Sequence, residues 1–186
     1  MNWRAAWLAG LLLASCGGSA SPALLDLDGR THQPMQRAPG TVHVVVFVSQ
    51  ECPIANSYAP TLQALAQRWA GKPLRLFVVH VDPDLGAQTA REHSKQFDLP
   101  GTVLLDPRHE LAHALGIRRT PEAVVLGDAG IAYRGRIDDQ WAALGSRRQE
   151  PSVHDLRDAV DAVLAGRAVS NPATDVVGCL LPEPKR

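Results

Sequence analysis

Runs of apolar residues divide the chain into alternating strands and helices. Two nearly continuous β-branched runs, 41–49 (TVHVVVFVS) and 74–81 (LRLFVVHV), are apolar on both faces, which is typical of buried central strands. Between them, residues 54–70 place apolar side chains at helical spacing, and Gly71 follows as a helix cap would. The pattern predicts a strand–helix–strand unit, in which the parallel strands need a right-handed crossover.

Shorter elements surround this unit. We expect further strands at 24–30, 103–105, 123–126 and 131–137, a hairpin turn at 128–130, and helices at 85–97, 109–115 and 152–165. The last helix is amphipathic, with one apolar face made of Val153, Leu156, Val160, Val163 and Leu164. A parallel beginning and an antiparallel end predict an α/β fold with a mixed central β-sheet and helices on both faces.

Composition and charge narrow the functional classes. The chain has 186 residues, 45% apolar and 20% charged, which suits one globular domain with short extensions. The formal net charge is zero and basic residues form only short pairs, so we expect no nucleic-acid partner. We also predict no cofactor and no bound metal.

The N-terminus has the pattern of a targeting signal. A charged start is followed by an apolar run of about ten residues, too short to cross a bilayer as a helix. The ending at 13–16 (LASC) resembles the bacterial lipobox, and the resemblance implies cleavage before Cys16 and its lipidation. An ordinary secretory signal with an incidental cysteine is the alternative. Both interpretations place the domain outside the cytoplasm, and the first makes it a periplasm-facing, membrane-anchored lipoprotein.

These observations predict four segments. They are a signal peptide with lipobox at 1–16, a flexible tether at 17–22, one domain at 23–166, and a C-terminal tail at 167–186 that contains Cys179.

Cys52 is the candidate reactive thiol. It stands between a buried strand and a helix, where unpaired backbone N–H groups and the helix dipole favour the thiolate over the thiol. The neighbouring Glu51 opposes this effect modestly. A buried, inert core cysteine is the alternative.

Three motifs together resemble a known family. They are Cys52-Pro53 after a strand, Arg119-Thr120-Pro121 before a strand, and 133–138 (YRGRID). Over residues 23–166 the chain resembles thioredoxin-like redoxins of the alkyl hydroperoxide reductase/thiol-specific antioxidant type. The resemblance implies a thioredoxin-like fold, oxidoreductase or antioxidant chemistry at Cys52, and a cis proline at Pro121 against that cysteine. An ordinary trans proline opening an edge strand is the alternative.

The chain departs from the best-known motifs of this group. Residues 52–55 (CPIA) lack the second cysteine of Cys-x-x-Cys, and Val45 replaces the proline of the peroxiredoxin pattern that Ser49 and Cys52 otherwise match. Residues 80–84 (HVDPD) resemble Sco-type copper chaperones. Those proteins need a second cysteine where this chain has Asn56, so one soft copper ligand is missing.

Cys179 lies beyond the last helix. That helix carries the chain about 20 Å away from the expected site. The following residues 167–178 are long enough to return, since an extended stretch of that length spans about 40 Å. Three roles stay open for Cys179: the redox partner of Cys52, one end of a structural disulfide, or a free thiol.

Several other residues are weaker candidates. The loop at 138–151 should end near Cys52, so Arg147 or Arg148 could stabilise a thiolate there, although solvated loop charge is the simpler interpretation. Asn56 and Tyr58 follow Cys52 and are candidates to line its pocket.

A zinc motif competes with the thiol interpretation. Residues 109–113 match H-E-x-x-H, with His109 and His113 as ligands and Glu110 as general base. The position of a third ligand is occupied by Arg119, which cannot coordinate zinc, and we expect both histidines to face solvent.

The sequence therefore favours an extracytoplasmic thiol–disulfide oxidoreductase or peroxidase-like redoxin that uses Cys52. Its partner would be a thiol or disulfide protein, or a peroxide. The alternatives are a non-catalytic redoxin-fold binding module, such as a copper chaperone, and a zinc hydrolase built on His109, Glu110 and His113.

Overall fold

The computed structural model describes residues 21–185. The predicted signal peptide, Cys16 and most of the predicted tether lie outside these residues. In the described part, no helix combines the length and the apolar character that crossing a membrane requires.

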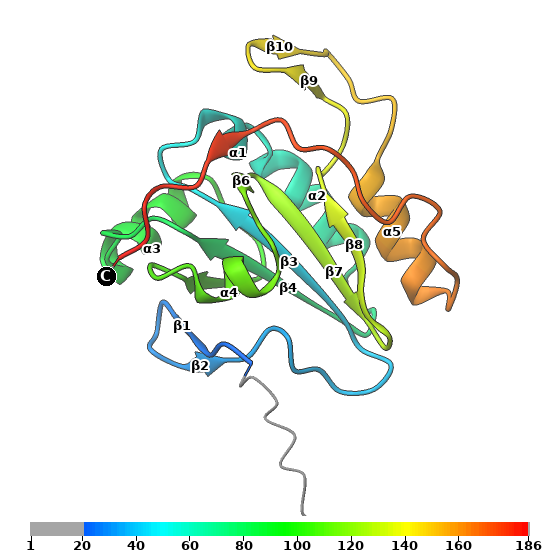
Figure 1. Ribbon diagram of the computed structural model, residues 1–186, viewed down its shortest axis with the longest axis horizontal. Coiled ribbons are helices and arrows are strands. Elements are labelled where there is room, and N and C mark those ends of the chain that lie inside the picture. The colour runs from blue at the N-terminus through cyan, green and yellow to red at the C-terminus, as the bar shows by residue number, and fades with distance from the viewer. Residues whose placement is uncertain (1–20, 186) are drawn as a thin grey trace, which may run out of the picture.

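A mixed sheet of seven strands forms the centre of the molecule (Figure 1). Its order is β2-β1-β5-β4-β3-β7-β8. The strands are β1 (Leu24–Asp26), β2 (Thr31–His32), β3 (Val42–Val48), β4 (Leu74–His80), β5 (Thr102–Leu105), β7 (Glu122–Gly127) and β8 (Gly130–Gly135). β3, β4 and β5 are parallel to one another, and β1, β7 and β8 pair antiparallel to their neighbours. The predicted mixed sheet is confirmed.

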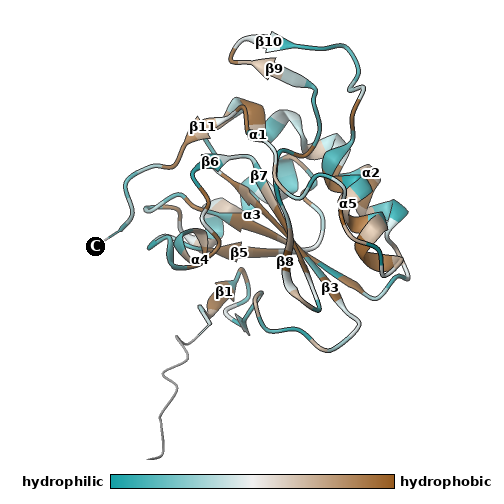
Figure 2. Cartoon of the chain, turned by 45° about the vertical axis from the view of Figure 1, so that its right-hand side comes forward, coloured by the Kyte–Doolittle hydropathy of each residue, from teal (hydrophilic) through white to brown (hydrophobic). Residues whose placement is uncertain are grey.

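Helices cover both faces of this sheet. They are α1 (Pro53–Ser57), α2 (Ala59–Arg68), α3 (Ala87–Gln96), α4 (Glu110–Ala114) and α5 (Asp155–Leu164). Because side chains alternate along β3, Val44 and Val46 pack in one core with α1, α2 and α5, while Val45 and Phe47 pack in a second core with α4. All seven residues of β3 are buried, as its two apolar faces predict. Figure 2 shows the apolar strands enclosed between the helices.

Two predicted helices have different limits. The expected helix over 54–70 is divided at Tyr58 into α1 and α2, and Pro60 stands in the first turn of α2, where its missing N–H breaks no helical hydrogen bond. The last helix begins at Asp155, three residues later than expected. Val153 therefore precedes the helix and is 43% exposed, so its predicted place on the apolar face is wrong.

The chain beyond β8 contains structure that the sequence pattern missed. The predicted loop over 138–151 contains a small hairpin of β9 (Trp141–Ala143) and β10 (Ser146–Arg147), which projects from the body of the molecule (Figure 1). The tail after α5 runs back along β8, where Arg134 N donates to Pro172 O at 2.9 Å. It ends as β11 (Cys179–Leu180), paired antiparallel with β6 (Arg119–Thr120).

Candidate functional site

Cys52 occupies the junction between β3 and α1. It is the N-cap of α1, with φ −86° and ψ 105°, and Pro53 follows in the first turn. The Ala55 N–H donates to Cys52 Sγ at 3.4 Å, so the backbone offers the sulfur a hydrogen-bond donor. The side chain is only 1% exposed. The sequence placed Cys52 correctly at the strand–helix junction.

The segment Thr120–Pro121 faces this sulfur. The peptide bond between the two residues is cis, as the family resemblance implied. The Thr120 carbonyl oxygen lies 3.2 Å from Cys52 Sγ, and Pro121 is buried. The tertiary structure thus brings together two motifs that are 68 residues apart in the chain.

Cys179 reaches the same place from the C-terminal tail. In the pairing of β11 with β6, Cys179 stands opposite Thr120, and its Sγ lies 2.6 Å from Cys52 Sγ. The approach is close: a Cβ on Gly178 would collide with the Thr120 carbonyl group, so only glycine fits there. Arg119 Nη1 donates to the Gly178 carbonyl at 3.1 Å. The tail over 167–178 therefore does return, and it brings the second sulfur against the first.

The two sulfurs differ in their surroundings. Cys179 is partly exposed, whereas Cys52 lies beneath it. Burial, together with the hydrogen bond to Cys52 and the negative charge of a Cys52 thiolate, raises the pKa of Cys179 to about 12. Cys179 therefore keeps its proton at neutral pH while the pair is reduced.

A buried polar cluster supports the loop that precedes Cys52. Asp82 accepts hydrogen bonds from Ser49 Oγ at 2.6 Å and Gln50 N at 2.9 Å. Burial works to raise the pKa of Asp82, but hydrogen bonds from His80, Ser49 and Gln50 outweigh burial and hold the pKa below its usual value. In the sequence, His80 and Asp82 stand out only through the resemblance of residues 80–84 to copper chaperones. Their position at the end of β4, beside the end of β3, was the signal for a structural role.

Asn56 and His93 extend this cluster. Asn56 Nδ2 donates to the Gln50 carbonyl at 2.9 Å, and a ring nitrogen of His93 lies 3.1 Å from Asn56 Oδ1. Burial, aided by repulsion from His80, lowers the pKa of His93 to about 4. His93 is therefore neutral at physiological pH. Asn56 fixes the loop backbone instead of meeting the sulfurs.

The other predicted pocket residues point elsewhere. Tyr58 Oη donates to Asp138 Oδ1 at 2.8 Å, and burial raises the pKa of Tyr58. Arg147 Nη2 donates to Gln140 at 3.3 Å, and Arg148 Nε donates to the Asp139 carbonyl at 3.0 Å. These hydrogen bonds hold the segment that leads into the β9–β10 hairpin, and none of them involves Cys52 or Cys179.

The H-E-x-x-H motif does not form a zinc site. His109 has φ 56° and stands before α4 as its N-cap, and its ring packs edge-on against the ring of His113, with 5.9 Å between the ring centres. Its ring is 1% exposed, and Nε2–H donates to the Val81 carbonyl at 2.7 Å. The expectation that both histidines face solvent is wrong for His109. Within residues 21–185, no three histidine, cysteine or acidic side chains are grouped to hold a metal ion.

The strand order, the cysteine that begins α1 and the cis proline opposite it define a thioredoxin-like fold. The Redoxin family model matches residues 17–141, and the chain belongs to this family. No curated protein sequence matches the chain.

Solved structures support the fold. A hypothetical protein of Sinorhizobium meliloti 1021 superposes with a TM-score of 0.74 at 24% identity, over 87% of this chain and 90% of the other. An uncharacterized conserved protein of Geobacillus kaustophilus gives 0.73 at 23% identity, over 87% and 88%. A secreted Mycobacterium tuberculosis disulfide oxidoreductase, described as homologous to E. coli DsbE, gives 0.53 at 15% identity, over 78% and 96%.

Proposed function

We propose that this protein is a thiol–disulfide oxidoreductase whose redox couple is Cys52 and Cys179. The observation that carries the proposal is the 2.6 Å separation of their sulfurs, beside the cis Thr120–Pro121 bond. The couple replaces the missing Cys-x-x-Cys motif, because the tail supplies the second thiol. The M. tuberculosis neighbour, a disulfide oxidoreductase by its description, supports the same class of reaction.

The exchange has two steps. The Cys52 thiolate attacks one sulfur of a partner disulfide, forms a mixed disulfide and releases the first partner thiolate. Cys179 then transfers its proton to the partner thiolate released in the first step and attacks Cys52 Sγ, which releases the second partner thiolate and leaves a Cys52–Cys179 disulfide. The partner gains two electrons and the protein loses two. Because Cys52 is buried beneath Cys179, the first step requires the two-residue strand β11 to separate from β6.

Pro121 has a positioning role in this proposal. The Thr120 carbonyl that precedes it lies 3.2 Å from Cys52 Sγ, and Thr120 also pairs with Cys179. The segment therefore holds both sulfurs in register.

We further propose that the protein acts outside the cytoplasm, held to the membrane through a lipid on Cys16. The charged and apolar N-terminal pattern supports this location, and the M. tuberculosis neighbour is described as secreted. An oxidising compartment would also allow the Cys52–Cys179 disulfide to persist.

Trapping with single-cysteine variants tests the reaction. With a disulfide-bonded protein substrate, Cys179→Ser should accumulate a mixed disulfide at Cys52, whereas Cys52→Ser should accumulate none under the same conditions. Wild-type protein should lose both thiols together and gain an internal crosslink visible by peptide mass spectrometry. If Cys179→Ser is instead labelled by dimedone only after peroxide treatment, the protein is a peroxidase. No adduct under either condition would refute thiol catalysis.

A further inference from the structure

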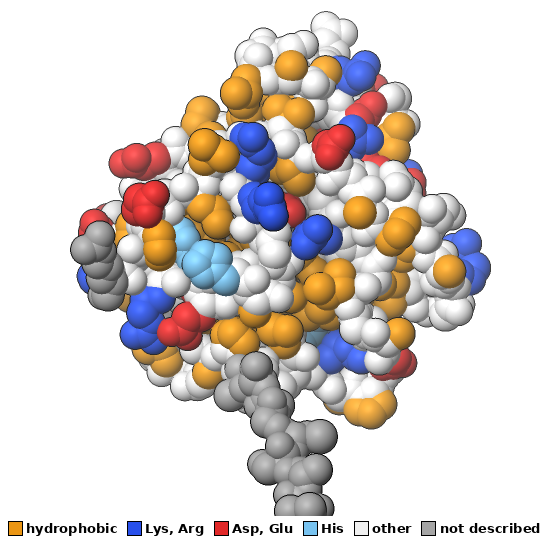
Figure 3. All heavy atoms as spheres, in the orientation of Figure 1, with side chains coloured by type: hydrophobic (Ala, Val, Ile, Leu, Met, Phe, Trp, Pro, Cys, Tyr) orange, Lys and Arg blue, Asp and Glu red, His pale blue; other side chains and the backbone are white. Residues whose placement is uncertain are grey.

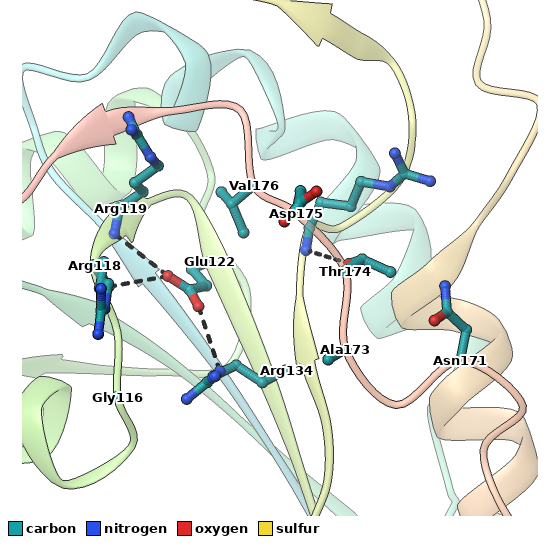
Figure 4. A pocket seen from close by; sticks show the side chains of 11 residues that line it. Gly116, Arg118, Arg119, Glu122, Arg134, Asn171, Ala173, Thr174, Asp175 and Val176 are labelled. Carbon is teal, nitrogen blue, oxygen red and sulfur yellow. Dashed lines mark hydrogen bonds and ion pairs between the residues drawn. The ribbon is translucent and has the colours of Figure 1, made fainter.

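A cavity of about 860 Å³ opens between the segment that leads to Thr120 and the tail that leads to Cys179. Its walls are β6, the start of β7, the end of β8 and the tail that leads to β11 (Figure 4). Both walls lead directly to the sulfurs: Arg119 precedes Thr120 on one side, and Val176 lies three residues before Cys179 on the other. The volume is in the range of sites that bind small molecules.

Arginine dominates the lining of this cavity. Arg118, Arg119, Arg134 and Arg136 contribute to it, against the carboxylates of Glu122 and Asp175. Figure 3 shows basic side chains gathered on the face over β6 to β8. Guanidinium groups bind carboxylates and phosphates in a planar, two-pronged geometry, so such a lining is suited to an anionic ligand.

The acidic residues cancel only part of these charges. Glu122 is buried and accepts hydrogen bonds from the backbone N–H groups of Arg118 and Arg119, at 3.1 and 3.3 Å. Its other oxygen lies 3.9 Å from Arg134 Nε. Arg136 is bound to Asp155 at 2.7 Å. Within residues 21–185, the side chains of Arg118 and Arg119 have no carboxylate partner within ion-pair distance.

The charges are also separated in space. In Figure 4, Arg118 and Arg134 lie on the side of Glu122 that faces away from Asp175. Arg134 is 45% exposed and Arg118 is exposed as well, so both guanidinium groups are open to a ligand from solvent. The part of the cavity that they line is therefore locally positive, although Asp175 lies across from them.

The tail wall is fixed by specific contacts. Thr174 Oγ1 accepts from Arg136 N at 3.0 Å and lies 2.7 Å from Tyr133 Oη. Arg134 forms an isolated bridge with Ala173. These contacts anchor the tail upstream of β11, so the cavity persists when the two-residue strand β11 separates from β6.

We propose that this cavity is a binding site for a small, carboxylate-bearing thiol or disulfide. Arg118 and Arg134 bind its carboxylates and direct its sulfur toward the Cys52–Cys179 pair. The site makes the exchange selective for anionic partners of low molecular weight. This inference rests on the proposed thiol–disulfide exchange, and it adds the class of substrate.

Three small disulfides of different charge test the proposal. Reduced protein is mixed with glutathione disulfide (anionic), bis(2-hydroxyethyl) disulfide (neutral) or cystamine (cationic), and the loss of free thiols is followed. The ratio of the rate constants for glutathione disulfide and cystamine should fall about fivefold in Arg118→Gln/Arg134→Gln, the size expected for two exposed charge pairs. The ratio should stay unchanged in the matched control Arg30→Gln, which lies at the β1–β2 turn and is 74% exposed.

Two further experiments distinguish failure of the proposed site from failure of the proposed exchange. Arg118→Gln alone removes a side chain with no hydrogen-bond or ion-pair partner in residues 21–185, so it tests the site if the double variant fails to fold. S-methylglutathione cannot exchange, and calorimetry should show that it binds wild type and Arg30→Gln but binds the double variant at least fivefold more weakly. An unchanged ratio, or no binding of S-methylglutathione to wild type, overturns the inference. Binding that depends on the arginines without reaction of any disulfide would refute the proposed exchange and leave the site standing.

Discussion

Neutral and charged polar groups share the buried space beneath the Cys52 loop. Asp82 is ionised and holds Ser49 and Gln50, whereas His93 is kept neutral by burial. Both groups make the fold less stable as the pH falls, each in the pH range below its ordinary pKa. An aspartate whose pKa is lowered stabilises the fold above its ordinary pKa, while a histidine whose pKa is lowered destabilises the fold once the unfolded chain can take up its proton.

The shift at His93 predicts a loss of stability in mild acid. Its pKa is about 4 in the folded protein against about 6.5 in the unfolded chain, so between these values the unfolded state binds more protons. The free energy of unfolding should therefore fall by about 2 kcal/mol from this group as the pH drops from 7 to 4.5. In His93→Phe the fall should be smaller by that amount. Urea unfolding at both pH values measures it, with the exposed His113→Gln as the control that leaves the pH dependence unchanged.

At the scale of elements, the decisive feature is a two-residue strand. β11 carries one of the two sulfurs. It is held by few contacts, which are its pairing with β6, the Arg119–Gly178 hydrogen bond and the close approach of Gly178 to Thr120. Such a short pairing can open easily, which the exchange requires, and it can close in one register only, because a shift by one residue would turn Cys179 to the other side.

The close approach at Gly178 gives a specific prediction. Gly178→Ala places a Cβ against the Thr120 carbonyl and should push β11 away from β6. We expect oxidation of the cysteine pair by a small neutral disulfide to slow by about tenfold, since a displacement of about 1 Å can cost a hundredfold in a reaction. Gly86→Ala is the matched control, because a Cβ there meets no atom within 4 Å. Equal oxidation rates in both variants would show that β11 tolerates the displacement.

For the whole molecule, the Cys52–Cys179 pair would close a loop across most of the domain. The two residues are 127 positions apart, and the loop between them includes the central strands β4 and β7. A disulfide here would limit the conformational freedom of the unfolded chain as well as acting in catalysis. The structural and redox roles that the sequence left open are therefore compatible.

Oxidation should accordingly stabilise the protein. We expect the oxidised form to exceed the reduced form by about 3–5 kcal/mol in free energy of unfolding, as a loop of this length predicts. Denaturant unfolding with and without a reductant measures the difference. In Cys179→Ser the reductant should have no effect. If the reductant also leaves the free energy of unfolding of oxidised wild-type protein unchanged, the Cys52–Cys179 disulfide contributes nothing to stability.

Sequence patterns predicted the elements that depend on local chemistry. The nearly continuous apolar residues of β3 and β4 encode buried parallel strands, because both faces of such strands are covered. The position of Cys52 between a strand and a helix follows from the same local pattern. Two local features differ from the prediction. The helix expected over 54–70 is divided before Pro60. The hairpin over 141–147 was not predicted, because most of its residues are exposed and no buried face produces an alternating apolar pattern.

By itself, the sequence determined the order of strands and helices, the mixed sheet and the place of Cys52, because hydrophobic periodicity and turn residues act over short distances. Only the tertiary structure decided that Cys179 meets Cys52, that His109 is buried and that four arginines surround one cavity. These outcomes depend on the final positions of the C-terminal tail and of strands that are distant in the chain. Those positions result from pairing and packing between segments that are far apart in the chain, and no local sequence pattern indicates which of them will meet.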